Sequence, residues 1–387
     1  MKASIIMPTY NSVELIIPCL ITLNHQILEE GDSFEVIVVD DGSNDGTGEA
    51  IHELILKYAL KYFYIDRSLA SSRAAARNLG LTEAEGEVII FLDGDHLVPP
   101  HFIQEHLRYH RERDDLVVIG FRNYLTSNDF DVEKLKTEFR EDLLPEQLPA
   151  DRLLAIDAFS EKMSNLETVW YFFFTCNASV SRRNIQEAGL FHEGFKGWGL
   201  EDCELAYRLY QQGLTFVYAK NALIYHMYHP SEYDENRYQN WLKNLHTFQE
   251  LHPSIDVQLL QLLKLFFNPE IRLFWFDSYL RFEYAVRAAH GNLPYKGPVS
   301  VYTVHSPLDD ASLNELIREA DERVVFVIDE SRDFRTSLSL LCAASKYDLM
   351  YYSAPSCPQK EMIFRQIAQY GVWRQVDYGK PIKEEHP

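Results

Sequence analysis

Two aspartates separated by one residue are candidate metal ligands. Asp93 and Asp95, with Gly94 between them, directly follow the apolar run EVIIFL. Carboxylate oxygens, together with substrate phosphates and water, are the ligands that Mg²⁺ and Mn²⁺ prefer. Asp and Gly are also common in turns, so a plain turn after a strand is the alternative interpretation. The position after a buried strand favours the metal site.

A histidine pair could complete such a site. His226 and His229 stand three residues apart in the stretch HMYHP. Neutral imidazoles are common ligands of divalent transition metals. The chain has 14 His residues, however, so a pair at this spacing can equally have a structural or surface role. Either histidine remains a candidate ligand.

Two adjacent carboxylates occur at a predicted helix start in GWGLEDCELAYRL. Glu201 and Asp202 follow Trp198, which lies between Gly197 and Gly199. A carboxylate at this position can act as a general base that takes a proton from a hydroxyl. The helix dipole also favours acidic residues in the first turn, and both roles can hold at once. Trp198 is then either a lid over a site or a core residue.

Several polar residues suit a nucleotide. In VVDDGSNDGT, Asp40 or Asp41 could accept a hydrogen bond from a base, and Ser43 with its glycine neighbours could approach a ribose or phosphate. Helix capping is the alternative role for this turn. Arg73 and Arg77 share one face of a predicted helix and could bind an anion, or they could be solvated. A dinucleotide fold is not supported, because the chain lacks GxGxxG.

The predicted elements bring these residues together. Apolar runs without strict alternation, which are typical of strands buried on both faces, cover 3–10, 34–43, 87–95 and 116–121. Helix-like segments cover 12–26, 46–60 and 71–84. This alternation predicts an α/β fold with an open, mostly parallel sheet and helices on both faces. The carboxyl ends of parallel strands meet at one edge, where ligands bind. The polar residues expected at that edge are Thr9, Tyr10, Asp40, Asp41, Asp93 and Asp95.

Further elements follow in the first domain. Residues 125–170 are acidic and less regular, with a helical stretch at 132–144. Residues 167–191 predict a strand or buried helix followed by a helix. Residues 214–230 predict two more strands, and 235–252 predict a helix.

The length of 387 residues favours two domains. The turn-rich stretch GNLPYKGP at 291–298 is typical of a linker. We therefore expect a first domain over 1–290 and a small α/β domain over 295–387, in which a strand and a helix alternate three times.

Composition excludes some functions. The formal charge of −21 argues against sequence-independent binding of nucleic acid or anionic lipid. The five Cys form no CxxC, which favours a reducing compartment and a cytoplasmic protein. No apolar run is long enough to cross a bilayer. The aromatic-rich region 262–285 predicts core or a homodimer interface, with peripheral membrane contact as the alternative.

The order of the motifs carries a family resemblance. MPTYN, VVDDGS, ARNLG, LDGD, GWGLEDCELAYRL and a later His follow one another over about residues 1–245. This order resembles the family-2 glycosyltransferases of the GT-A fold. The GWGxED segment is also similar to the corresponding loop of β-1,4-galactosyltransferases and chondroitin polymerase-like enzymes.

The resemblance implies a nucleotide-sugar donor, most often a UDP-sugar, and Mn²⁺ or Mg²⁺. It implies that Asp95 and Asp93 bind the metal, with His226 or His229 as a further ligand. The implied donor site consists of Pro8, Thr9, Tyr10, Asp40, Asp41, Ser43, Arg73, Arg77, Asp93 and Gly94.

The resemblance also implies the chemistry. Asp202 matches the general base of inverting members, and Glu201 and Trp198, with Gly197 and Gly199 beside it, would contact the acceptor or donor sugar. A hexose or N-acetylhexosamine would pass to a glycan, peptide or small-molecule acceptor. A sugar nucleotidyltransferase and a non-catalytic nucleotide-sugar-binding scaffold are the alternatives. The nucleotidyltransferase lacks support, because the N-terminal stretch has no basic, glycine-rich loop for a triphosphate.

Overall fold

The computed structural model describes residues 1–150, 166–230, 235–267, 275–290, 299–320, 325–344, 349–353 and 372–378. The chain divides into two compact units, Met1–Arg272 and Leu273–Pro387. The linker predicted at 291–298 lies outside the described residues, as does the helix-like stretch 357–371.

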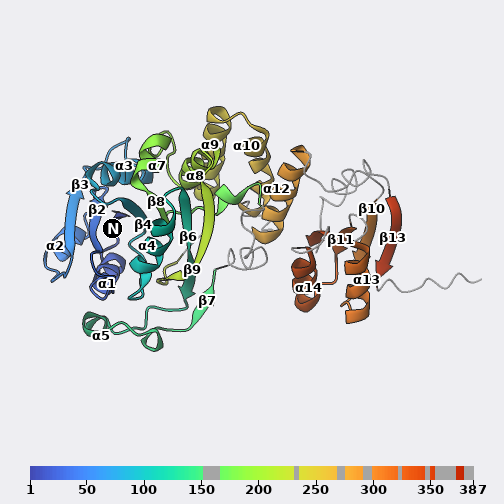
Figure 1. The fold of residues 1–387 in the computed structure, drawn as a ribbon, viewed down its shortest axis with the longest axis horizontal. Helices are drawn as coiled ribbons and strands as arrows, with labels where there is room; N and C mark the ends of the chain where they lie inside the picture. The colour runs from blue at the N-terminus through green and yellow to red at the C-terminus, as the bar shows by residue number, and fades with distance from the viewer. Residues whose placement is uncertain are drawn as a thin grey trace, which may run out of the picture. The chain divides into compact units, whose positions relative to one another are not determined.

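One half of the sheet in the first unit is parallel (Figure 1). Its order is β3-β2-β1-β4, and every neighbouring pair runs in the same direction. The bounds are β1 (Lys2–Thr9), β2 (Ser33–Asp40), β3 (Ala59–Tyr64) and β4 (Val88–Leu92). The carboxyl ends of these strands meet at one edge, which confirms the predicted arrangement.

The other half of the sheet is mixed, although its strands β6 and β9 run in the same direction as β1 to β4. Its order continues β8-β6-β9-β5, with β8 antiparallel to both β4 and β6, β9 parallel to β6, and β5 antiparallel to β9. Short β7 pairs with β6 in antiparallel fashion. Apolar runs report burial but not strand direction. The bounds are β5 (His96–Leu97), β6 (Leu116–Leu125), β7 (Gln147–Pro149), β8 (Asn177–Ser181) and β9 (Thr215–His226).

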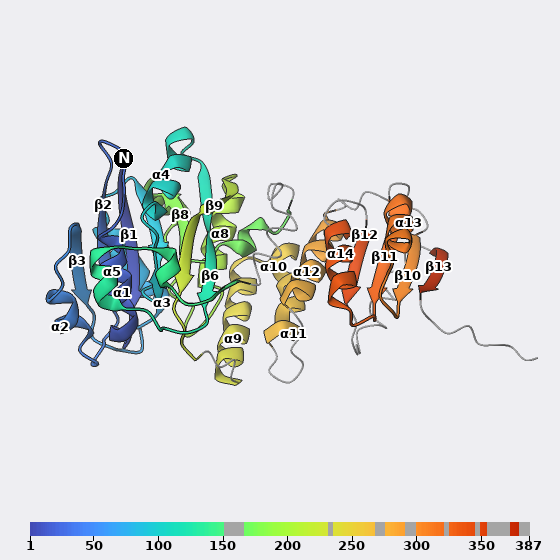
Figure 2. The ribbon, with the colours of Figure 1, turned by 90° about the horizontal axis from the view of Figure 1, so that it is seen from below.

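Helices cover both faces of this sheet (Figure 2). The helices α1 (Val13–Leu23) and α4 (Phe102–Glu112) share a buried core with Ala3, Ile5 and Met7 of β1. The helix α3 (Arg73–Glu83) lies on the opposite face, where Gly80 meets Ile6. A Cβ at Gly80 would lie 2.7 Å from the Ile6 side chain, so the close packing of α3 requires glycine.

The first unit also contains further helices, which connect the strands or follow them along the chain. They are α2 (Thr47–His52), α5 (Val132–Thr137), η1 (Glu141–Leu143), η3 (Val169–Phe172), α7 (Arg182–Ala188), α8 (Glu201–Gln211), α9 (Glu235–Leu251), α10 (Ile255–Leu259), η4 (Leu260–Leu263) and α11 (Lys264–Phe267).

Two predicted elements differ from the structure. The helix expected over 46–60 ends at His52, and β3 begins at Ala59, because the local pattern cannot reveal that β2 offers this segment a partner. The two strands expected over 214–230 are one strand, β9, with an irregular register.

That irregularity lies beside the buried side chain of Asn177, which we call the polar hub of the mixed half. Gly120 of β6 pairs with Ala219, but the next residue pairs with Leu223. The Asn177 amide donates to the carbonyls of Phe121 (2.8 Å) and Ala222 (2.7 Å) across this register shift. A Cβ at Gly120 would lie 2.2 Å from Asn177 Oδ1, so only glycine fits there. The hub sets the direction of the last residues of β6 and β9.

The second unit confirms the α/β expectation for the tail. Its sheet has the order β12-β11-β10-β13, and all pairs are parallel. The edge strand β13 was not predicted. The elements are α12 (Trp275–Ala289), β10 (Val299–Val304), α13 (Asp310–Ala320), β11 (Val325–Asp329), α14 (Phe334–Ala344), β12 (Leu349–Ser353) and β13 (Val372–Tyr378).

The aromatic-rich region supplies core side chains. Leu263, Phe267, Tyr279 and Phe282 are all buried, as the core interpretation predicts. Among the described residues, no helix is both long and apolar enough to cross a bilayer.

Candidate active site

The ends of β4 and β9 bring an aspartate and three histidines together. The ligand atoms of Asp95, His96 and His226 all lie within 4.8 Å of one another. His226 Nε2 lies 3.4 Å from Asp95 Oδ2, and His229 Nε2 lies 3.3 Å from the same oxygen. The short antiparallel pairing of β5 with β9 places His96 opposite His226. The structure thus joins the predicted Asp95 to both predicted histidines.

Two buried atoms in this cluster have no hydrogen-bond partner. They are Asp95 Oδ1 and His96 Nε2, although His96 Nδ1 lies 2.6 Å from that oxygen. Burial alone would raise the pKa of Asp95, but the three histidines hold it well below its usual range. An ionised carboxylate beside imidazole nitrogens is a donor set suited to Mn²⁺ or Mg²⁺. The residues present therefore fit the expected metal.

Asp93 belongs to a second, separate ion-pair network. Arg77 is buried, and its Nη2 donates to Asp93 Oδ1 at 3.0 Å while its Nη1 donates to Glu201 Oε1 at 3.1 Å. Arg77 therefore joins the loop after β4 to the start of α8. This differs from the predicted role as an anion ligand, because both terminal nitrogens already bind carboxylates. Arg73 is exposed, and its Nη1 donates to the carbonyl of Gly197.

The first turn of α8 separates the roles of its two acids. Glu201 is buried against Arg77, whereas Asp202 is partly exposed and lines a cavity. Asp202 Oδ1 accepts a hydrogen bond from the amide of Cys203 at 2.8 Å. The positive end of the helix dipole and the nearby Arg77 both favour a charged carboxylate. Both predicted acids line the cavity, but Asp202 is the more exposed of the two.

The GWG segment before α8 needs its glycines. Gly197 and Gly199 have φ of 70° and 98°, in the left-handed region that favours glycine. The amide of Asn244 on α9 donates to the carbonyls of Lys196, Trp198 and Gly199. Trp198 is partly exposed in the cavity wall, so it is not simply a core residue.

The predicted nucleoside residues gather at the ends of β1 and β2. Thr9 Oγ1 lies 2.8 Å from Ser12 Oγ, and the amide of Asn11 donates to Ser43 Oγ at 2.8 Å. Tyr10 is 47% exposed, so its ring is available for a ligand. Pro8 pairs with Val39 at the end of the strand.

The two aspartates at the end of β2 have different partners. Asp40 is fully buried and accepts hydrogen bonds from the Tyr62 hydroxyl and the Ser43 amide, so it braces the turn. Asp41 forms an ion pair with Arg67 at 2.5 Å. The Arg67 guanidinium also lies 4.0 Å from the centre of the Tyr10 ring. Asp41, Arg67 and Tyr10 thus form one cluster at the surface.

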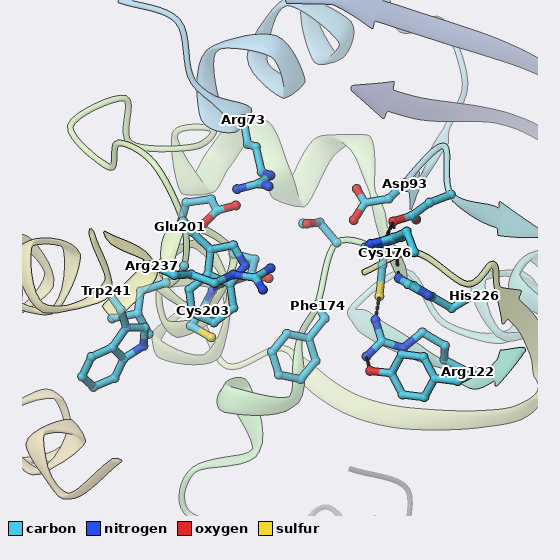
Figure 3. Close-up of a pocket in the computed structure, with 18 of the residues that line it drawn as sticks. Arg73, Asp93, Arg122, Phe174, Cys176, Glu201, Cys203, His226, Arg237 and Trp241 are labelled. Atoms are coloured by element: carbon cyan, nitrogen blue, oxygen red, sulfur yellow. Dashed lines mark hydrogen bonds and ion pairs between the residues drawn. The ribbon is translucent and has the colours of Figure 1, made fainter. Parts of the chain in front are cut away.

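A cavity of about 570 Å³ lies over the metal-ligand cluster and the start of α8 (Figure 3). One side carries Asp93, His226 and Arg122, with Asp95 beside His226, and another carries Trp241, Arg237 and Cys203. The nucleoside residues of β1 and β2 do not line it. Gly94 does not line it either; a Cβ there would lie 3.1 Å from Ile16, so glycine allows the loop to approach α1.

Several site residues were missed from the sequence. His96 directly follows the Asp-Gly-Asp motif, and its place beside two acids was the available signal. Arg67, Arg122, Arg237 and Asn244 carry no local signal, because their neighbours come from distant parts of the chain.

Comparison with known proteins finds two matching family models. Residues 4–188 match the model of glycosyl transferase family 2, and residues 159–230 match the model described as the N-terminal domain of galactosyltransferase. The two matches together include every predicted site residue.

Three curated relatives are similar over most of the first unit. An uncharacterized glycosyltransferase, YfnE of Bacillus subtilis, is 32% identical over 60% of this chain and 66% of the relative. Chondroitin synthase of Escherichia coli is 29% identical over 67% of this chain and 38% of the relative. Validoxylamine A glucosyltransferase of Streptomyces hygroscopicus is 30% identical over 66% of this chain and 62% of the relative. The chain therefore spans less than two thirds of each relative.

Solved structures also show partial likeness. The crystal structure of S. aureus TarS 1–349 in complex with UDP-GlcNAc superposes with a TM-score of 0.49 and 18% identity, covering 89% of this chain and 88% of that one.

Proposed function

We propose that this chain, a glycosyltransferase of family 2 with a GT-A fold in its first unit, is an inverting, metal-dependent transferase. Its donor would be a UDP-sugar carrying a hexose or N-acetylhexosamine. Its acceptor would be a hydroxyl of a glycan, a peptide or a small molecule. The observation that carries this proposal is the placement of Asp202 in the same cavity as the Asp95–histidine cluster.

The donor would lie along the carboxyl edge of the sheet. Tyr10 and Asp41, with Arg67, would hold the nucleoside at the ends of β1 and β2. Asp95 and His226, with His96 and His229 beside them, would hold Mn²⁺ or Mg²⁺ at the diphosphate. When bound, such an ion neutralises charge on the diphosphate as the sugar leaves.

Asp202 would act as the general base. Its carboxylate would accept the proton of the acceptor hydroxyl while that oxygen forms a bond to the anomeric carbon. The bond from this carbon to the diphosphate breaks on the opposite face, which inverts the configuration. Glu201 cannot take this role easily, because its carboxylate is buried and paired with Arg77.

The aromatic wall would hold the acceptor. Trp198 and Phe267 contact each other with ring centroids 5.5 Å apart, and Trp241 stacks on Phe267 at 4.6 Å. Flat apolar rings beside the base would pack against the apolar face of a sugar ring. A carbohydrate or a similar polyhydroxyl acceptor therefore suits this wall.

Metal-dependent release of UDP tests the proposal directly. The chain would be incubated with a panel of UDP-sugars and Mn²⁺, and UDP would be measured with and without excess EDTA. We expect release from at least one donor that stops when EDTA is added. UDP binding without release from any donor, with candidate acceptors present, would instead favour a nucleotide-sugar-binding scaffold.

A further inference from the structure

Arg122 is a partly buried cation on the metal side of the cavity. It lies on β6, two residues before Tyr124, which pairs with His226 of β9. Its Nη2 donates to the Tyr124 hydroxyl at 2.7 Å, and its Nη1 lies 3.4 Å from Cys176 Sγ. Figure 3 shows the guanidinium below His226, next to the Cys176 thiol. The register shift held by Asn177 directly precedes this segment and sets its direction.

The charge of Arg122 is compensated differently from that of Arg77. Arg77 donates to two carboxylates, Asp93 and Glu201. Within the described part of the chain, the hydrogen bonds of the Arg122 guanidinium go to a thiol and a phenol, and no carboxylate forms an ion pair with it. Burial lowers the pKa of Arg122, but its neighbours, including Asp95 and Asp93, raise it overall. The side chain therefore stays charged and can bind an anion.

The order of the strands in the sheet indicates which anion Arg122 would bind. The nucleoside residues lie at the ends of β1 and β2, and Asp95 follows β4. The sheet continues from β4 through β8 to β6, away from the nucleoside. A donor laid along this edge thus passes its nucleoside, then the metal ligands, and then Arg122. The group that reaches β6 is the phosphate that carries the sugar.

We propose that Arg122 binds the sugar-bearing phosphate of the nucleotide-sugar donor, beside the metal ligands, with Tyr124 and Cys176 holding its guanidinium in place. This inference rests on the proposed function. During transfer the acceptor oxygen bonds to the anomeric carbon, and the electron pair of the broken bond stays on the phosphate oxygen. Arg122 then donates a hydrogen bond to that phosphate, and Asp202 holds the acceptor's proton. A planar guanidinium suits this task, because it offers paired N–H donors to phosphate oxygens.

Calorimetric binding of UDP and of UMP, each with Mn²⁺, tests the role of Arg122. UMP lacks the second phosphate, so its affinity should depend little on Arg122. We expect Arg122→Met to weaken UDP binding by roughly 10–100-fold, as for a lost charge-assisted hydrogen bond, and UMP binding by less than about 3-fold. Arg122→Lys keeps the charge and should lose less UDP affinity than the Met variant. Arg108→Met is the matched control, because Arg108 also lies beside a tyrosine ring but is half-exposed on α4.

The outcomes separate this inference from the proposed function. If the wild type binds UDP and the Met and Lys variants bind it equally well, Arg122 does not contact the donor phosphate. If those variants lose affinity only for a UDP-sugar that carries a carboxylate, Arg122 binds the sugar, and the inference is likewise wrong. If the wild type binds no UDP with Mn²⁺, the proposed function fails and the role of Arg122 fails with it. Thermal melting would show whether the Met variant folds; if it does not, the Lys variant decides by losing affinity for UDP but not for UMP.

Discussion

The two halves of the large sheet position their polar residues in different ways. In the parallel half, the loops after β1, β2 and β3 bond to one another, as in the contacts of Asn11 with Ser43 and of Asp41 with Arg67. Where the parallel half meets the mixed half, single side chains join segments more than 100 residues apart, as Arg77 does with Glu201 and Asp95 does with His229. The proposed nucleoside end therefore depends on neighbouring loops, whereas the proposed reacting end depends on long-range contacts. A substitution of the buried Asn177 should therefore disturb the proposed reacting end more than the proposed nucleoside end.

The largest effect is expected from Asn177→Ala. This change removes both amide hydrogen bonds across the register shift and leaves the buried His106 Nε2 without its partner at 2.9 Å. We expect a loss of roughly 3–5 kcal/mol in the free energy of unfolding, since each unsatisfied buried group costs about 1–3 kcal/mol. Urea unfolding followed by circular dichroism would measure it.

A matched change in the parallel half gives the control. Tyr62→Phe removes one hydrogen bond to Asp40, at 2.6 Å, and leaves the ring in place. A cost of about 1 kcal/mol is expected, which is the usual net value of one hydrogen bond. Equal losses in the two variants would contradict the view that the mixed half depends on its hub.

A smaller loss of stability in the mixed half is expected when the pH is lowered. Burial lowers the pKa of His106 to about 3 and that of His110 to about 4, and both rings contact Ser179 of β8. Both folded-state values lie below the ordinary pKa of His, so the unfolded chain takes up protons first as the pH falls. Stability should therefore decrease from about pH 6.5 towards pH 4, by about 3–4 kcal/mol between pH 7 and pH 5.

Unfolding curves at pH 7 and pH 5 would measure this loss. The variant His110→Gln removes one titrating group, so its stability should change less between the two pH values than that of the wild type. If the wild type is equally stable at both pH values, the two histidines are not held neutral in the folded protein.

The sequence predicted the parts of the site that local patterns encode. Asp95 directly follows Gly94, and Asp202 lies three residues after Gly199, both at element boundaries. The alternation of strands and helices implied that such boundaries share an edge. The direction of β8 could not be predicted, because burial on both faces gives the same apolar run in either direction. The role of Arg77 could not be predicted either, since its two carboxylates come from different loops.

Local sequence patterns also explain why the role of Arg122 was missed and why the α/β fold of the second unit was predicted. Arg122 reads as an ordinary strand residue until the register shift places it in the cavity. The strand–helix alternation of the tail sufficed to predict an α/β unit, because its four strands are all parallel. Its edge strand β13 was missed, since its pattern of polar and apolar residues is weak.

The measurement that tests the central claim most directly is the turnover of Asp202→Asn. Asparagine has the same shape and can still accept the hydrogen bond from the Cys203 amide, but it cannot take a proton. The assay would be metal-dependent hydrolysis of the preferred UDP-sugar, in which water replaces the acceptor, with UDP binding measured in parallel. We expect the rate to fall by roughly 10²–10⁴-fold while the affinity for UDP with Mn²⁺ stays within a few-fold of the wild type. A rate close to that of the wild type would show that Asp202 is not the general base.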